Sequence, residues 1–131
     1  MEKRIVKLVL ILLCLSFTAP LFAKEPISIS IIKLIANSDK YHGKFVRIFG
    51  YVELEFEGTA IYLSKEDADK HLSKNGLWLD LAEAVKCSEC RNKFCLIEGI
   101  FNSEHKGHFN QWSGSLEKIT RFEVWQEQVP K

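Results

Sequence analysis

The sequence lacks the short motifs by which many enzymes are recognised. Its 131 residues contain no Gly-x-Ser-x-Gly elbow, which exposes a nucleophilic serine, and no phosphate-binding Gly-Lys-Ser/Thr loop. No segment has the spacing of an EF-hand calcium loop. The sequence therefore predicts no catalytic residue, no cofactor and no metal ligand, and it favours a protein that is not an enzyme.

An excess of charge of one sign is also missing. Lysine and arginine together number 18, aspartate and glutamate number 17, and the formal net charge is +1. Proteins that bind nucleic acid usually carry a basic stripe, because lysine and arginine displace counterions from the phosphates. The balanced charge argues against a nucleic-acid partner and leaves the ligand or protein partner unnamed.

The first 23 residues are organised like a secretory signal peptide. A basic segment at 2–7 precedes an apolar run at 8–17, and Ala23 offers a small residue before a cleavage site. The apolar run is too short to span a bilayer as a mature helix, so we expect no stable membrane anchor after cleavage. An uncleaved anchor is the alternative. Cleavage would leave 24–131 as a single periplasmic or secreted domain with 15 basic and 16 acidic residues, a net charge of about −1.

The rest of the chain alternates apolar and polar residues, which is typical of β-strands. The longest such stretch is 43–58, whose inward face is expected to carry Val46, Ile48, Gly50, Val52, Leu54 and Phe56. Further strands are expected at 60–64, 77–81, 93–101 and 115–125, and helices at 28–37 and 64–72. A glycine in mid-strand, such as Gly50, marks a bend or a bulge. Ile119 breaks the alternation of the last strand and indicates a bulge near Lys118.

Two of the expected strands share a pattern. Residues 44–50 and 93–99 both read Lys-Phe-x-x-Ile-x-Gly, 49 positions apart. A single echo is too little for a repeat protein, which stacks several copies. It predicts two strands with equivalent bends at Gly50 and Gly99, and it places Cys95 at the position equivalent to Val46, on the inward face.

Five strands with two matched bends predict a mainly β fold: a five-stranded, OB-like, partly open barrel with an N-terminal helix and a short helix after strand two. The run 37–50 resembles the helix-to-first-strand junction of small exported bacterial OB-fold proteins of an uncharacterised family, and 93–99 is similar to that fold's fourth strand. The usual helix between strands three and four must then fit into 82–92. The resemblance implies a binding module whose ligand lies across strands two and three and the nearby loops.

The cysteines allow three interpretations. Cys87 and Cys90 form a Cys-x-x-Cys pair, followed by Cys95, His105 and His108. We expect a structural disulfide between Cys87 and Cys90 in an oxidising compartment, with Cys95 free and buried. A zinc site or a dithiol redox pair is the alternative, and it would make the protein metal- or thiol-dependent.

Aromatic side chains predict a binding surface on the outer face of the sheet. Tyr51, Tyr62 and Trp78, with Arg47 and Phe49 beside them, are expected to form a stacking surface. The competing expectation is that the N-terminal helix covers part of this face with Ile31, Leu34 and Ile35, since four exposed aromatic residues are unusual on a soluble monomer.

Acidic residues alternate along the same stretch. Glu53, Glu55 and Glu57 are expected to be its solvated face, with binding of calcium or a cationic peptide, helped by Asp67, Asp69, Asp80 and Glu83, as the alternative.

The signal-peptide prediction is tested by the intact mass of the protein recovered from outside the cytoplasm. We expect the mass of a chain that begins near Lys24, because the export machinery removes its leader. A mass that begins at Met1 in the exported material would contradict the prediction.

Overall fold

The stretches of period-two alternation form the strands of one sheet. The structure is a computed structural model that describes residues 2–4, 23–81 and 87–126. Its strands are β1 (Ile27–Ser28), β2 (Phe45–Glu53), β3 (Ala60–Tyr62), β4 (Gly76–Leu79), β5 (Lys93–Asn102) and β6 (Ser115–Val124). Residues 5–22 of the predicted signal peptide lie outside the described ranges.

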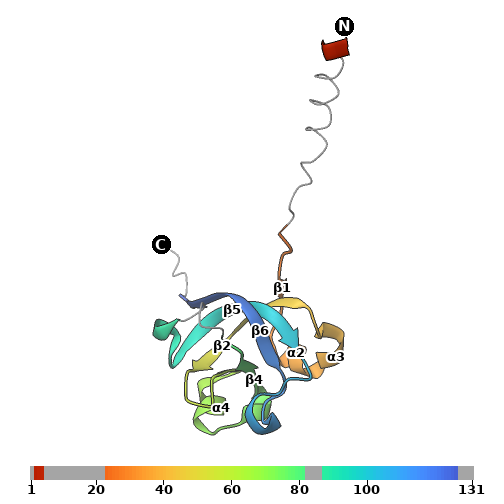
Figure 1. Ribbon diagram of the computed structural model, residues 1–131. Coiled ribbons are helices and arrows are strands. Elements are labelled where there is room, and N and C mark those ends of the chain that lie inside the picture. The colour runs from red at the N-terminus through yellow and green to blue at the C-terminus, as the bar shows by residue number, and fades with distance from the viewer. Residues whose placement is uncertain (1, 5–22, 82–86, 127–131) are drawn as a thin grey trace.

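The sheet closes into a barrel (Figure 1). The strands follow the order β2, β3, β4, β6, β5, and β5 pairs in turn with β2. Neighbouring barrel strands are antiparallel except β4 and β6, which are parallel. The short β1 lies outside the barrel, parallel to β2. The mainly β, OB-like prediction is confirmed, although the barrel is closed rather than partly open.

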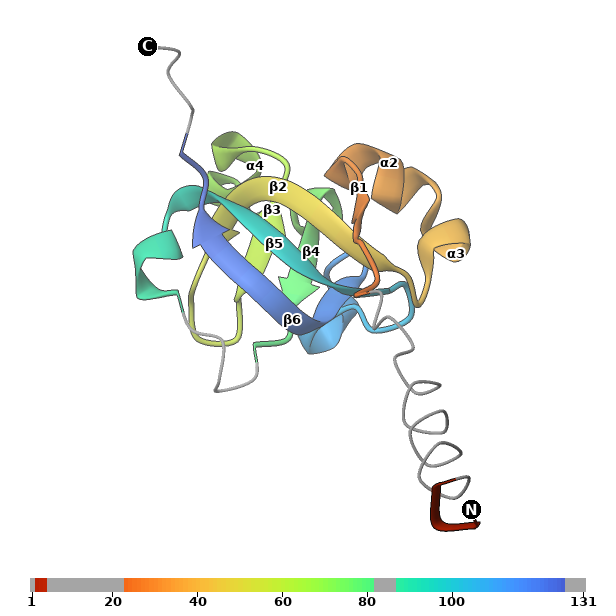
Figure 2. The same ribbon diagram turned by 90° about the horizontal axis from the view of Figure 1, so that it is seen from above.

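Short helices flank the barrel. They are α2 (Ile31–Ala36), α3 (Ser38–Tyr41), α4 (Lys65–Asp69) and the 3₁₀ turns η1 (Ser73–Asn75), η2 (Ser88–Cys90) and η3 (His108–Asn110). The α2 and α3 helices lie near the start of β2, and α4 lies near its end (Figure 2). The helix predicted after strand two is α4. The stretch 82–92, where the helix between strands three and four was expected, contains the 3₁₀ turn η2. Residues 82–86 of this stretch lie outside the described ranges.

The N-terminal helix, α2, is shorter than predicted, and a second short helix, α3, follows it. The α2 helix begins at Ile31 because residues 27–28 pair with β2, and Ser30 caps it by accepting a hydrogen bond from the Lys33 N–H at 3.2 Å. Its β-branched residues make α2 a weak helix by propensity. Burial of Ile31 and Leu34 in the barrel core holds it in place.

Barrel closure depends on a bend in β2. Residues 45–52 of this strand pair with β5, while Tyr51–Glu53 pair with β3 on the other edge. A Cβ on Gly50 would lie 2.5 Å from the backbone oxygen of Tyr62, so only glycine allows β3 to approach this closely. A Cβ on Gly99 would similarly lie 2.8 Å from the backbone oxygen of Glu117. At both glycines of the shared pattern, a neighbouring strand therefore lies too close to leave room for a side chain.

The predicted irregularity in the last strand is also present. The pairing of β5 with β6 shifts register between Glu98 and Ile100, opposite residues 118–120. Lys118 has a φ of 48°, in the left-handed region that non-glycine residues seldom occupy. The extra residues on β6 let Ile119 turn inward, where it is buried.

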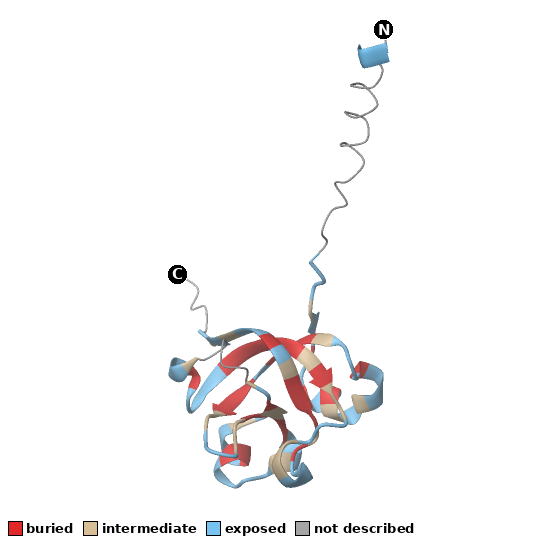
Figure 3. Ribbon diagram, viewed as in Figure 1, coloured by how far each residue is buried: buried red, intermediate tan, exposed pale blue. Residues whose placement is uncertain are grey.

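The barrel interior is the main hydrophobic core (Figure 3). Its largest fully buried side chains are Phe101, Ile31, Leu34, Ile48, Ile61, Leu77, Leu79, Ile97 and Leu116. The inward prediction holds for Val46, Ile48 and Val52 but is wrong for Phe56, which is 93% exposed. The reason is that β2 ends at Glu53, so the alternation no longer sets the side-chain direction at Phe56. None of the described helices has the length and apolar character that a membrane-spanning segment needs.

The bend makes Gly50 a sensitive position. We expect Gly50→Ala to lower the free energy of unfolding, measured by urea denaturation, by about 1–3 kcal/mol, because the added methyl group overpacks the β2–β3 contact. Gly58→Ala is the matched control, since its Cβ would meet no atom closer than 3.7 Å. Its effect should stay within about 1 kcal/mol. Equal losses in the two variants would contradict this account of Gly50.

Candidate ligand-binding cleft

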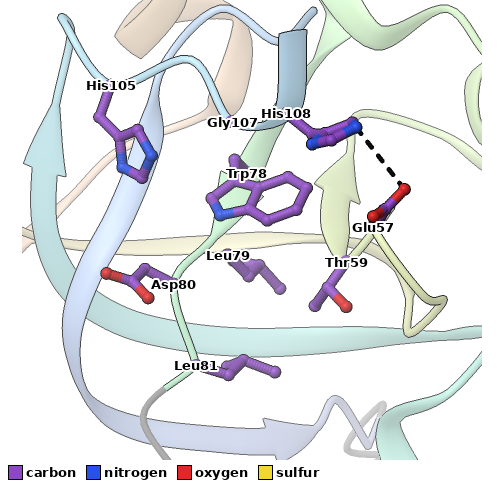
Figure 4. A pocket seen from close by; sticks show the side chains of 9 residues that line it. All are labelled: Glu57, Thr59, Trp78, Leu79, Asp80, Leu81, His105, Gly107 and His108. Atoms are coloured by element: carbon purple, nitrogen blue, oxygen red, sulfur yellow. Dashed lines mark ion pairs between the residues drawn. The ribbon is translucent and has the colours of Figure 1, made fainter. Parts of the chain in front are cut away.

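A cleft of about 530 Å³ opens where three segments of the barrel meet. The segments are the connection 54–59 between β2 and β3, the end of β4, and the loop 103–114 between β5 and β6. The cleft is lined by Glu57, Thr59, Trp78, Leu79, Asp80, Leu81, His105, Gly107 and His108 (Figure 4). Since β3 and β4 are the second and third barrel strands, the cleft lies in the region where OB folds bind their ligands.

Strand alternation places two side chains of β4 and its exit in the cleft. Leu77 and Leu79 are buried in the barrel core, so Trp78 and Asp80 project to the opposite face. Figure 4 shows Trp78 in the middle of the cleft, with His105 and Asp80 on one side of it and Glu57 and His108 on the other.

The indole ring of Trp78 is fixed by its neighbours. It packs edge-to-face against Trp112, with ring centroids 5.0 Å apart. Gly107 has a φ of +68°, and a Cβ there would lie 2.6 Å from the Trp78 Cε3 atom. Glycine therefore lets the loop backbone press against the ring. The Nε1–H of the buried Trp112 finds no acceptor among the described residues, so Trp112 contributes through packing.

Hydrogen bonds close the loop 103–114 on itself and anchor it to η1. The Trp112 N–H donates to the Lys106 carbonyl at 3.1 Å, and the Ser113 hydroxyl donates to the Lys74 carbonyl at 2.6 Å. The Lys74 ammonium in turn donates to the backbone oxygens of Asn110 and Trp112, at 3.1 and 3.3 Å. These contacts hold the loop against η1 and keep the cleft wall in place.

The two cleft histidines each face a carboxylate. His105 Nδ1 lies 3.0 Å from Glu117 Oε1, which also accepts hydrogen bonds from the side chains of Asn102 and Ser115. His108 Nε2 lies 3.6 Å from Glu57 Oε2, beyond ordinary hydrogen-bond distance. His105 is therefore tied to β6, and His108 only approaches the 54–59 connection.

The predicted aromatic surface is not exposed as a whole. Tyr51 and Tyr62 are only 6% and 2% exposed, in a second cluster with Ala60, Ala68 and Trp112. Burial raises the pKa of the Tyr62 phenol. The cover comes from α4 and the 103–114 loop, whereas the N-terminal helix directs Ile31 and Leu34 into the barrel core. Of the four predicted binding residues, only Trp78 lines the cleft.

Arg47, the fourth predicted binding residue, is held by an ion pair. Its Nε donates to Glu98 Oε1 at 2.6 Å, and Arg121 Nη1 contacts the same oxygen at 3.3 Å. Glu98 is buried, and a buried carboxylate needs such partners to offset its desolvation. The geometry gives Arg47 a structural role across β2, β5 and β6.

The alternating acidic residues Glu53, Glu55 and Glu57 have different environments and do not form one solvated face. Burial, reinforced by the nearby Glu55 carboxylate, raises the pKa of Glu53. Glu55 is exposed, and Glu57 lies in the cleft. Asp67 is engaged elsewhere, since hydrogen bonds from Asn75 and Ser64 lower its pKa.

The cysteines lie away from the cleft lining. The sulfur atoms of Cys87 and Cys90 are 2.22 Å apart, at disulfide-bonding distance. Cys95 is buried and unbonded, and its sulfur contacts the Cys90 carbonyl at 3.5 Å. Among the described residues, no three or more His, Cys, Asp or Glu side chains are grouped so that they could hold a metal ion.

No protein-family model matches the chain, and no curated protein matches it. The cleft geometry is therefore the basis for a functional proposal.

The sequence identifies most of the polar cleft residues one by one but does not predict that they lie together. Separate patterns in the sequence point to Trp78, to Asp80 and Glu57, and to the two histidines. Their proximity depends on closure of the barrel, which no local pattern shows. Thr59, Gly107 and the covering role of Trp112 were missed. The only sequence feature that points to Gly107 is its place between His105 and His108. This feature does not predict that the backbone of Gly107 packs against the Trp78 ring.

The buried Cys95 thiol should be nearly unreactive in the folded protein. Burial raises its pKa to about 11. At pH 8 this leaves about one thiolate in a thousand, against about one in ten for a thiol with the reference pKa of 9.0. We expect iodoacetamide to modify the Cys95 peptide at least about a hundredfold more slowly in the native protein than in denaturant, as measured by peptide mass spectrometry.

The same shift makes stability depend on pH. The unfolded thiol ionises near pH 9 and the folded thiol near 11, so ionisation favours the unfolded chain and the free energy of unfolding should fall between these values. Cys95→Ala lacks this contribution and should show a smaller fall. Identical pH profiles for the two proteins would contradict the assigned burial effect.

Proposed function

We propose that the protein is an exported, non-enzymatic OB-type binding module that holds its ligand or partner in the cleft around Trp78. The observation that carries the proposal is a fixed indole ring in an open cleft at the OB binding region, with polar side chains converging on it from three segments. A fixed aromatic residue with a few placed polar groups is the usual composition of a ligand site. We place this module in the periplasm or outside the cell.

The charges of the cleft support a ligand other than nucleic acid. Glu57 and Asp80 line it, and no lysine or arginine does so among the described residues. Polyanions are bound through basic side chains that replace their counterions. A carboxylate-lined cleft opposes this mode of binding.

A thiol-dependent function is the second candidate. Cys87 is partly exposed while Cys90 is buried, and a redox pair needs one accessible sulfur. Cycling of this pair would be detected as reduction by thioredoxin coupled to re-oxidation by a substrate disulfide. Loss of cleft binding would not affect it.

The binding proposal is tested by the indole ¹H–¹⁵N resonances of the purified full chain, which contains three tryptophans. The probes are decathymidylate, chitopentaose and the peptide Gly-Lys-Gly-Lys-Gly. We expect at least one probe to displace the Trp78 resonance, and Trp78→Ala to weaken its binding by about tenfold or more, since a central tryptophan dominates the energy of a binding site.

Trp125→Ala is the matched control. Trp125 is exposed at the end of β6 and packs on Phe49, away from the cleft lining. Its substitution should leave probe affinity unchanged. The proposal fails if no probe moves the Trp78 resonance, or if the two substitutions weaken binding equally.

A further inference from the structure

The fixed charges in the cleft have one sign among the described residues. Glu57 comes from the 54–59 connection and Asp80 from the exit of β4, and Figure 4 shows them on opposite sides of Trp78. Carboxylates are ordinarily ionised at neutral pH, and they accept hydrogen bonds without donating any. A ligand between them is therefore favoured if it is positive and rich in N–H donors.

These two carboxylates have bonding capacity left, unlike several others in the protein. Glu98 is bound by two arginines, and Glu117 accepts from three side chains. Within the described ranges Asp80 forms no ion pair, and the one ion-pair partner of Glu57 there is His108, whose Nε2 lies 3.6 Å from Glu57 Oε2. Incoming donors would not have to displace a strong internal partner from either carboxylate.

The ring between the carboxylates suits the same ligand. A cation within about 6 Å of an indole centroid is attracted to the negative face of the ring, and tryptophan provides the strongest such attraction. Trp112 and Gly107 already fix the Trp78 ring. Little side-chain entropy remains to be lost when a ligand binds.

We propose that the cleft binds an amine or guanidinium group, held against the ring of Trp78 and between the carboxylates of Glu57 and Asp80. This inference rests on the proposed function and adds the chemical class of the ligand. A neutral sugar also stacks on indole, but its hydroxyl groups gain less than a cation from two negative charges. The cationic group has two sources, a free polyamine or the lysine and arginine side chains of a partner protein.

A pair of peptides that differ only in charge isolates this preference. The probes are Gly-Lys-Gly-Lys-Gly and the same peptide with both lysines Nε-acetylated, together with spermidine as the free polyamine. Binding to the full chain is followed by the Trp78 indole resonance and by calorimetry. We expect the unmodified peptide, spermidine or both to bind, the acetylated peptide to bind at least about fivefold more weakly, and added salt to weaken the binding of the charged probes.

Neutral isosteres test the two carboxylates without disturbing the core, since both side chains are exposed. Glu57→Gln and Asp80→Asn should each weaken binding of the charged probes by roughly two- to fivefold, as expected for an exposed charge pair. Glu66→Gln is the matched control, because Glu66 is an exposed carboxylate on α4 outside the cleft lining. It should leave the affinity unchanged.

The outcomes separate this inference from the function it rests on. If chitopentaose or decathymidylate binds at Trp78 while neither spermidine nor the charged peptide does, the cationic ligand is excluded and the binding function stands. Equal affinity for the two peptides also excludes it. If no probe perturbs Trp78, the inference and the binding proposal both fail. Binding of the peptide alone assigns the cation to a protein partner, and binding of spermidine alone assigns it to a polyamine.

Discussion

The structure depends on β2 pairing along both of its edges. This strand joins β5 over most of its length and β3 at its end, and these two pairings close the barrel. A flat strand cannot pair with both β3 and β5 around so small a core, so β2 must curve. Gly50 lies where a side chain would collide with the backbone of β3. The interior can then be filled by the side chains that alternation directs inward.

Closure also brings the cleft together. The 54–59 connection, the exit of β4 and the 103–114 loop are far apart in the sequence, and they meet because β4 pairs with β3 on one side and β6 on the other. Trp112 and α4 cover the tyrosine end of the outer face and leave the Trp78 end open. Of the predicted aromatic surface, packing has therefore covered Tyr51 and Tyr62, while Trp78 lines the cleft and Phe49 stays exposed beside Trp125.

Charged side chains on the outside of the barrel are of two kinds: those in ion pairs across the sheet and those that line the cleft. On β2, β5 and β6, Glu98 bridges Arg47 and Arg121, so positive and negative groups compensate one another across three strands. Around Trp78, the carboxylates come from a connection and a strand exit, and no lysine or arginine among the described residues lines the cleft. The Glu98 carboxylate is therefore neutralised by ion pairs across the sheet, whereas the carboxylates of Glu57 and Asp80 in the cleft are exposed.

The sequence by itself determined the approximate positions of the five barrel strands, the need for glycine at Gly50 and Gly99, the bulge near Lys118 and the burial of Cys95. Each follows from local periodicity or from the conformational freedom of glycine, which are properties of neighbouring residues. The sequence did not determine that the N-terminal helix would direct Ile31 and Leu34 into the core, or that Arg47 would be held by Glu98. Only the tertiary structure decided which outward residues are covered and which share the cleft, because that depends on contacts between segments tens of residues apart in the chain.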